Sequence, residues 1–188
     1  MAEVVLFHHG QGLTLGVAGF AHKLRGAGHS VHTPNLYGRP AFDDFLEGTT
    51  HAYSIGLDEM IKRGALAVEE IAAEVVYAGF SMGVLPAQML AQVREGAKGA
   101  LLFHNCLPYT AFGSWPAGVP VQVHAMEHDP VFLSGDIENA RNLLAHPEAE
   151  LFLYPGDEHI FTDDSMASYD EEATALLMER VLTFLERC

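Results

Sequence analysis

Short apolar runs recur along the whole chain, and a longer segment separates each run from the next. The runs occupy residues 3–8, 30–34, 74–79, 99–104, 119–125 and 150–155. They are rich in β-branched residues or simply apolar, without a regular alternation of apolar and polar residues, which is typical of strands that are covered on both faces of a parallel sheet. Because the intervening segments have helical periodicity, the pattern predicts right-handed crossovers and a doubly wound α/β fold.

Three of the intervening segments and the C-terminal segment predict helices. Apolar residues repeat at helical spacing in 17–24, 57–71 and 85–93. Gly64 interrupts the second of these segments. The last helix is the most distinct, because Ser168 and Glu171 match a capping box and an apolar stripe then runs from Leu177 to Leu185.

The composition indicates a globular chain and excludes several classes of partner. A length of 188 residues with 49% hydrophobic content predicts one domain, residues 1–188, with a substantial core. No apolar run approaches the roughly 18 residues of a membrane span, and the N-terminus lacks the basic segment of a signal peptide, so a cytoplasmic protein is expected. A net charge of −15 argues against nucleic acid or an anionic membrane as a partner. The two cysteines, Cys106 and Cys188, form no disulfide framework.

The strongest chemical motif follows the third apolar run. Residues 79–83 read Gly-Phe-Ser-Met-Gly, which is G-x-S-x-G at a junction between a strand and a helix. A nucleophile on such a turn adopts strained dihedral angles, and glycines on either side allow the strand and the helix to approach each other closely. Ser81 is therefore the candidate nucleophile, although the same residue pattern also occurs at an ordinary helix start.

A nucleophilic serine needs a base and an acid that orients the base. On this type of fold the expected chain order is serine, acid, histidine. Asp129 follows the fifth apolar run and His159 follows the sixth, so both fall at the same edge of the sheet as Ser81. Glu127 and Asp157 are rival acids, but Glu127 lies too near the end of its strand and Asp157 shares the loop of the histidine.

A hydrolytic serine also needs two donors for the oxyanion. The N–H of Met82, directly after the serine, is the first candidate. The second is expected from the loop after the first strand, and the sequence leaves Gly10 and Gln11 as alternatives.

Other chemistries fit the sequence less well. The pairs His8–His9 and His124–His128 suggest metal ligation, but neither is an H-E-x-x-H motif on a helix, so no metal is expected. The glycines after the first strand do not form G-x-G-x-x-G, and no acidic residue ends the second strand, so no dinucleotide is expected either. The prediction is an enzyme without a cofactor.

With these motifs in place, the chain resembles the dienelactone hydrolase family of α/β-hydrolases over nearly its full length. The similar segments are HHGQG at 8–12, TPNLYGRPAFDDFLEG at 33–48, GFSMG at 79–83, MEHDPVF at 126–132 and YPGDEHIF at 154–161. The resemblance implies a nucleophile, aspartate and histidine acting on esters or lactones, here Ser81, Asp129 and His159. It also implies about six parallel strands in the order 2-1-3-4-5-6, and the chain begins at the family's third strand, without its N-terminal hairpin.

Four positions relate this chain to the family's substrate chemistry. Members that cleave dienelactone use a cysteine where Ser81 stands, and a glutamate where His9 stands. Of the two arginines that bind the substrate carboxylate, one is matched by Arg39, whereas the other falls at Asp163. The resemblance therefore implies a substrate site around His9, Tyr37 and Arg39 with a weakened clamp for an anionic substrate.

The expected function is hydrolysis of a small ester or lactone through an acyl-enzyme. The alternatives are a non-catalytic binding protein of the same fold, or an acyltransferase or thioesterase that uses the same three residues. Two loop-like stretches, 35–56 and 105–118, carry aromatic residues that form either pocket walls or ordinary packing. A small molecule is the expected partner, and the chain is expected to be a monomer or a homodimer.

Overall fold

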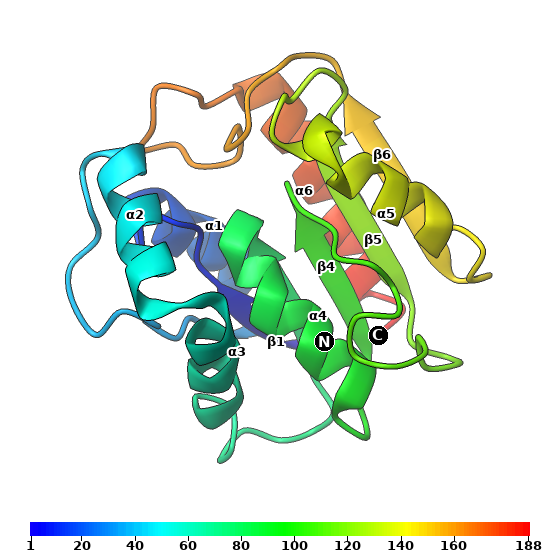
Figure 1. Ribbon diagram of the computed structural model, residues 1–188. Helices are drawn as coiled ribbons and strands as arrows, with labels where there is room; N and C mark the ends of the chain where they lie inside the picture. Colours follow the sequence, from blue (N-terminus) through cyan, green and yellow to red (C-terminus); the bar gives the residue numbers. More distant parts are fainter.

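The computed structural model describes residues 1–188 and contains one parallel six-stranded sheet (Figure 1). The strands are β1 Glu3–Phe7, β2 Ser30–His32, β3 Val76–Phe80, β4 Gly99–Phe103, β5 Val121–Met126 and β6 Ala149–Tyr154. Their order in the sheet is β2-β1-β3-β4-β5-β6, and every neighbouring pair is parallel. The predicted α/β fold and strand order are confirmed, with each strand ending within a few residues of its expected boundary.

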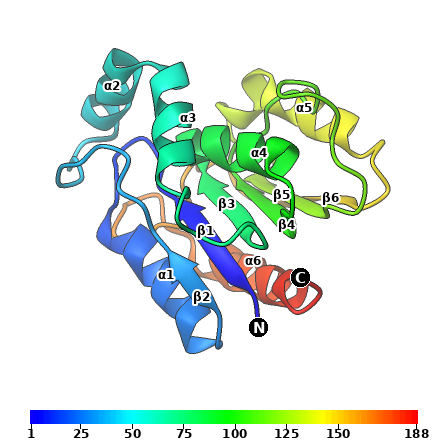
Figure 2. The same cartoon turned by 90° about the horizontal axis from the view of Figure 1, so that it is seen from below.

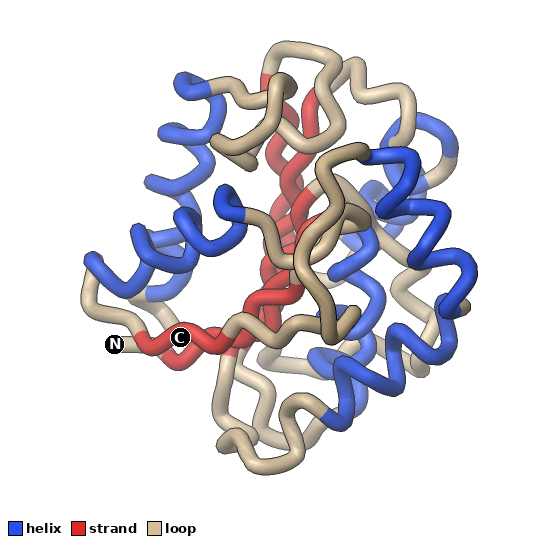
Figure 3. Tube along the Cα trace, turned by 90° about the vertical axis from the view of Figure 1, so that its left-hand side faces the viewer, coloured by secondary structure: helices blue, strands red, loops and turns tan.

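Helices cover both faces of the sheet. They are α1 Leu15–Gly26, α2 Phe45–Ile55, α3 Leu57–Leu66, α4 Val84–Val93, α5 Asp136–Leu143 and α6 Glu171–Leu185. Helices α1 and α6 lie on one face, and α3, α4 and α5 lie on the other (Figure 2). Seen along its edge, the twisted sheet runs between the two helical layers (Figure 3).

The buried strands supply side chains to two separate cores, one on each face. On β1, Val4 and Leu6 join the core beneath α1 and α6, whereas Val5 and Phe7 join the core beneath α3, α4 and α5. Successive residues of a strand point to opposite faces, so a strand covered on both sides is mostly apolar at consecutive positions. This is why β1, β3 and β4 do not alternate between apolar and polar residues. Gln122 and His124 of β5 are buried exceptions, and they form hydrogen bonds.

Part of the expected loop 35–56 is a helix. Asp44 begins α2 by accepting a hydrogen bond from the Glu47 N–H at 2.9 Å. Only Gly48 and Ala52 of this helix are buried. An exposed helix of this kind has no apolar stripe, so its periodicity is not visible in the sequence.

Two further expectations about helices are corrected. Helix α3 ends at Leu66 instead of continuing to residue 71, and it contains Gly64. Glycine is required at position 64 because a Cβ on this residue would overlap the Pro86 ring of α4. The N-cap of α6 is Asp170, which accepts from the Ala173 N–H at 2.8 Å, and not Ser168. The Ser168 hydroxyl instead donates to the Ile160 carbonyl at 3.0 Å, so the capping-box prediction is wrong.

The strand order places a crevice at the carboxyl ends of β1 and β3. After β1 the chain crosses to β2 on one side, and it then returns to β3 on the other side of β1. At such a switch point the connecting loops diverge, and ligands bind in the space between them. None of the helices combines the length and the apolar character that a membrane crossing requires.

Candidate active site

Ser81 lies on a tight turn at this crevice. Strand β3 passes into a 3₁₀ turn, Ser81–Gly83, which leads directly into α4. The φ angle of Ser81 is +49°, in the left-handed region that residues with a side chain rarely occupy. A Cβ on Gly79 would overlap the Gly83 carbonyl, and a Cβ on Gly83 would overlap the Phe7 carbonyl. Both glycines of the motif are therefore required by the packing of the turn.

The structure brings Ser81, His159 and Asp129 into one chain of hydrogen bonds. The Ser81 Oγ lies 2.8 Å from His159 Nε2, and His159 Nδ1 lies 2.7 Å from Asp129 Oδ2. Asp129 is fully buried, whereas the His159 side chain is 12% exposed and faces the opening. Because an ionised carboxylate only accepts hydrogen bonds, Nδ1 carries the proton and Nε2 is left to accept from the serine hydroxyl.

The main chain anchors the carboxylate of Asp129. Its Oδ1 accepts from the N–H groups of Val131 at 2.8 Å and Phe132 at 3.3 Å, which leaves Oδ2 for the histidine. The rival acids lie elsewhere: the Glu127 side chain is 47% exposed beside His128, and Asp157 is exposed.

A further carboxyl group, which no sequence motif marks, lies near the three residues. Asp136, in the first turn of α5, is half-buried. Burial raises the pKa of Asp136 to about 6, the charge of His159 opposes this change, and the charge of Asp129 adds to it. In the sequence it is an ordinary acidic residue of a helix N-terminus, so no signal distinguishes it.

Hydrogen bonds fix the loop after β1 and leave the N–H of Gly10 without an acceptor. The Tyr37 hydroxyl donates to the Gly10 carbonyl at 2.7 Å, and the Gln11 N–H donates to His9 Nδ1 at 3.3 Å. Gly48 of α2 lets the helix pack on this loop, because a Cβ there would lie 2.6 Å from the Gly10 oxygen. The Gly10 N–H, in contrast, donates to no acceptor within the protein.

A buried hydrogen-bonded pair connects this loop to the segment after His159. His9 Nε2 donates to Asp163 Oδ2 at 2.8 Å, and both side chains are almost fully buried. Thr14 and Ser165 also donate to the Asp163 carboxylate. His9 and Asp163, which the family resemblance matched to a glutamate and to a second arginine, contact each other in the structure.

The Asp163 carboxylate is held in its charged form. Burial alone would raise its pKa, but hydrogen bonds from His9, Ser165 and Thr14 outweigh burial and lower the pKa of Asp163 to about 2. A carboxylate whose pKa lies below that of an unfolded aspartate stabilises the fold above about pH 4. This stabilisation is lost as the pH falls toward 2.

We expect Asp163→Asn to lower the free energy of unfolding by about 2 kcal/mol at pH 7. The difference from wild type should shrink below pH 4, where the carboxylate of the unfolded wild-type chain becomes protonated. Urea denaturation at pH 7 and pH 3 measures both values. The neighbouring Asp164→Asn is the matched control, because Asp164 is 41% exposed and its ion pair with Lys23 spans 3.6 Å. An equal loss in both variants would contradict the assigned role of Asp163.

His104 packs behind His159. It follows β4 with a φ of +66°, is fully buried, and its ring centroid lies 5.9 Å from that of His159. Its Nε2 lies 2.9 Å from the Thr162 hydroxyl, whereas its Nδ1 has no partner. Burial and the charges of the neighbouring histidines hold the pKa of His104 well below its usual range, so this ring is neutral. In the sequence, the only indication that His104 lies near the site is its position directly after the end of β4.

The histidines considered as metal ligands have other partners. His8 Nε2 accepts from the Leu36 N–H at 3.0 Å, and His124 lies between the Tyr154 hydroxyl and the Gln122 amide. Burial lowers the pKa of His8 to about 4 and that of His124 to about 3. No group of three or more His, Cys, Asp or Glu side chains is arranged to hold a metal ion.

Two adjoining clefts open near the site; His159 lines one of them, whereas Ser81 and Asp129 line neither. The histidine cleft has a volume of about 390 Å³, and its walls include Phe45, Glu158, His159, Ile160 and Met166. The α1 cleft has a volume of about 510 Å³, and its walls include Gln11, Leu15, Phe42, Asp43, Phe45 and Met166. Phe45, Met166 and Ala167 belong to both clefts and therefore form the ridge between them.

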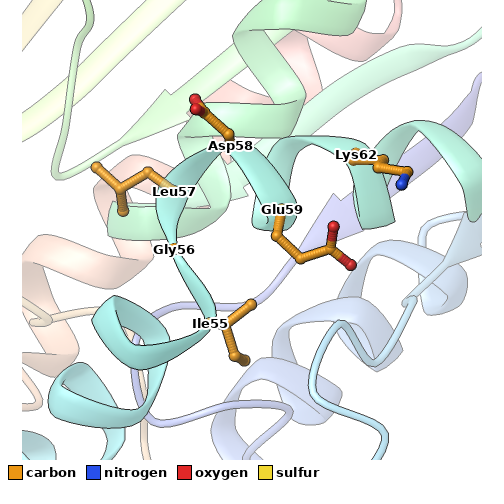
Figure 4. Close-up of a pocket in the computed structure, with 6 residues that line it drawn as sticks. All are labelled: Ile55, Gly56, Leu57, Asp58, Glu59 and Lys62. Carbon is orange, nitrogen blue, oxygen red and sulfur yellow. The ribbon is translucent and has the colours of Figure 1, made fainter.

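A further hollow lies elsewhere and shares no residue with the site. It measures about 590 Å³ and is lined by the last residue of α2, Gly56 and the first turns of α3 (Figure 4). The charged side chains of Asp58, Glu59 and Lys62 surround it. It contains no serine, cysteine or histidine and lies apart from Ser81, Asp129 and His159, so it is not the candidate active site.

The residues expected to bind substrate, His9, Tyr37 and Arg39, lie outside the walls of both clefts. His9 and Tyr37 are buried and direct their polar atoms to the protein, and neither lines the two clefts. Arg39 is exposed, with its guanidinium carbon 3.9 Å from the centre of the Phe42 ring. From the loop 105–118, Trp115 is buried and donates to the Val119 carbonyl at 2.8 Å, and no residue of this loop lines either cleft.

A parallel six-stranded sheet in this order, with a serine on a strained turn after β3, defines an α/β-hydrolase. The sequence profile of the dienelactone hydrolase family matches residues 1–188. The chain therefore belongs to the dienelactone hydrolase family and is a hydrolase that acts on ester bonds. No curated protein sequence gives a significant match.

Solved structures share the fold at low sequence identity. A dienelactone hydrolase-like promiscuous phosphotriesterase from metagenomic libraries is 18% identical with a TM-score of 0.82, over 99% of this chain and 86% of that chain. A protein from Klebsiella pneumoniae subsp. pneumoniae, to which dienelactone hydrolase activity is ascribed, is 19% identical with a TM-score of 0.78, over 100% and 88%. A cold-adapted esterase from an Arctic intertidal metagenomic library is 20% identical with a TM-score of 0.64, over 98% and 83%.

Proposed function

We propose that this protein is a serine hydrolase that cleaves small esters or lactones through an acyl-enzyme. Ser81 is the nucleophile, His159 is the general base, and Asp129 orients the imidazole. The observation that carries the proposal is the continuous chain of hydrogen bonds, 2.8 Å from Ser81 to His159 and 2.7 Å from His159 to Asp129. Nucleophile, base and orienting acid at these distances are what acyl transfer from an ester requires.

The proposed reaction has two halves. His159 Nε2 takes the proton from Ser81 as Oγ attacks the ester carbonyl, and the resulting imidazolium then donates this proton to the departing alcohol. In the second half, His159 activates a water molecule that attacks the acyl-serine and releases the acid. Asp129 stays ionised and stabilises the imidazolium that forms in each half.

We assign the oxyanion donors to the N–H groups of Met82 and Gly10. Met82 directly follows the nucleophile, at the start of the helical segment that includes α4. Gly10 is preferred over Gln11 because the Gln11 N–H is already bonded to His9 Nδ1, whereas the Gly10 N–H is free. His9 and Tyr37 then act as positioning residues, since both hold the Gly10–Gln11 segment in place.

Covalent labelling tests this proposal. A fluorophosphonate probe should add one adduct per chain, and peptide mass spectrometry should place it on Ser81. Ser81→Ala should take up no adduct, whereas Ser114→Ala, which changes an exposed serine in the loop 105–118, should be labelled like wild type. Folded wild-type protein that remains unlabelled, or an adduct on any other residue, would remove the basis for the proposal.

A further inference from the structure

The two clefts that meet at Phe45, one of them lined by His159, differ from what a site for an anionic ester needs. No lysine or arginine lines either of them. The only charged side chains in their walls are carboxylates, Asp43 in the α1 cleft and Glu158 in the histidine cleft. A carboxylate on a substrate would meet like charges there without a cation to pair with.

The family resemblance implied a substrate-binding arginine at residues 39 and 163. Neither residue supplies a cation to the clefts. Arg39 is exposed and stacks on the ring of Phe42, without lining either cleft. Asp163 replaces the second arginine, and its carboxylate is buried against His9, Thr14 and Ser165. The charge of −15 on the whole chain further disfavours an anionic substrate.

The ridge between the clefts is apolar and close to the reacting atoms. The Phe45 ring stands edge-on to the His159 ring, with centroids 6.2 Å apart, and Met166 adjoins Phe45 in both clefts. Beyond the ridge, Leu15 and Phe42 extend the apolar surface of the α1 cleft. This cleft also reaches Gln11, next to the oxyanion donor proposed above.

We propose that the Phe45–Met166 ridge and the α1 cleft form a binding subsite for an uncharged, apolar arm of the ester. This inference rests on the proposed serine hydrolase function. A flexible methionine and an aromatic ring offer an adaptable apolar surface, so the subsite accepts chains of several carbons. The carboxylates of Asp43 and Glu158 exclude an arm that ends in a negative charge.

A series of p-nitrophenyl esters tests the subsite by kinetics. From acetate to hexanoate, kcat/KM should rise at least about tenfold, because each buried methylene adds roughly a threefold preference. The carboxylate-terminated mono-p-nitrophenyl glutarate should react at least about tenfold more slowly than p-nitrophenyl valerate. A series without dependence on chain length, or a glutarate ester that matches the valerate, would overturn the inference.

Variants on α2 locate the subsite. Phe45→Ala should reduce the ratio of hexanoate to acetate kcat/KM by about five- to tenfold. Leu46→Ala is the matched control, because Leu46 is adjacent on α2, 71% exposed and outside both clefts, and should keep the wild-type ratio. Replacing both carboxylates, Asp43→Asn with Glu158→Gln, should narrow the gap between glutarate and valerate. Equal ratios in Phe45→Ala and Leu46→Ala would contradict the proposed location.

Binding without turnover separates this inference from the proposed function. Ser81→Ala with ¹³C-labelled methionine methyl groups can be titrated with N-methylhexanamide, an uncharged analogue of the ester. The Met166 resonance should shift with this ligand but not with the same amide ending in a carboxylate. If binding follows this pattern while wild type hydrolyses no ester, the subsite stands and the serine hydrolase proposal fails. If esters are hydrolysed but Met166 does not respond, the subsite fails alone.

Discussion

Ser81→Ala is expected to reduce kcat for p-nitrophenyl acetate by roughly 10⁴-fold or more. Without the hydroxyl, His159 has no proton to take and no acyl-enzyme forms, so only water attack on the bound ester remains. The fold should be unaffected, because alanine occupies the same φ of +49° at a similar strain and fits where the serine Cβ already lies. A stopped assay with excess ester measures kcat, and a thermal melt checks the fold.

The same experiment can refute the assignment. Ser114→Ala, at an exposed position in the loop 105–118, should retain wild-type kcat. If Ser81→Ala also retains activity within about tenfold, the nucleophile is another group. Cys106 is an unsuitable substitute for that role, because it is buried and burial raises the pKa of its thiol to about 12.

The sheet could be predicted from the sequence because its physical cause is local in the chain. A parallel strand covered on both faces is mostly apolar at consecutive positions, and β1, β3 and β4 meet this condition, whereas the runs at 30–34 and 119–125 also contain polar residues. Helix α2 could not be predicted in this way, since Leu46 and Tyr53 are 71% and 64% exposed and no apolar stripe marks a buried face. Asp44 begins this helix, but one capping residue without periodicity is a weak signal.

The capping error at α6 has a related cause. Ser168 and Asp170 both have side chains that can accept from a helix N–H, and the spacing of Ser168 to Glu171 matched the reciprocal pattern. In the structure the Ser168 hydroxyl finds the Ile160 carbonyl, a partner eight residues away, and Asp170 takes the capping position. Local pattern alone does not decide between two capping residues when one of them has a tertiary partner.

The placement of Ser81, Asp129 and His159 at one sheet edge also followed from local signals. Each residue lies within four residues of the end of a predicted strand, and parallel strands end at the same edge, so topology brings them together. Contacts that span the chain could not be found in this way. His9 and Asp163 are 154 residues apart and bond through buried atoms, and the free N–H of Gly10 is recognisable only after its neighbours are paired.

The second large effect is expected from Asp129→Asn, which should lower kcat by roughly 10⁴-fold while leaving the fold intact. The N–H groups of Val131 and Phe132 both donate to Oδ1, so they require an oxygen at that position in the asparagine as well. The amide NH₂ must then face His159 Nδ1, 2.7 Å away in the wild type. A donor there forces Nδ1 to become an acceptor, and the ring proton moves to Nε2.

An imidazole with its proton on Nε2 donates to Ser81 instead of accepting from it, so it cannot act as the base. Nitrogen chemical shifts of His159 in labelled protein report this change of tautomer directly, alongside the loss of kcat. Asp157→Asn and Glu127→Gln are the matched controls, because these acids lie near the same loops with exposed side chains and should keep wild-type kcat. If either control loses as much activity as Asp129→Asn, or if Asp129→Asn keeps the wild-type tautomer, the orienting role does not belong to Asp129.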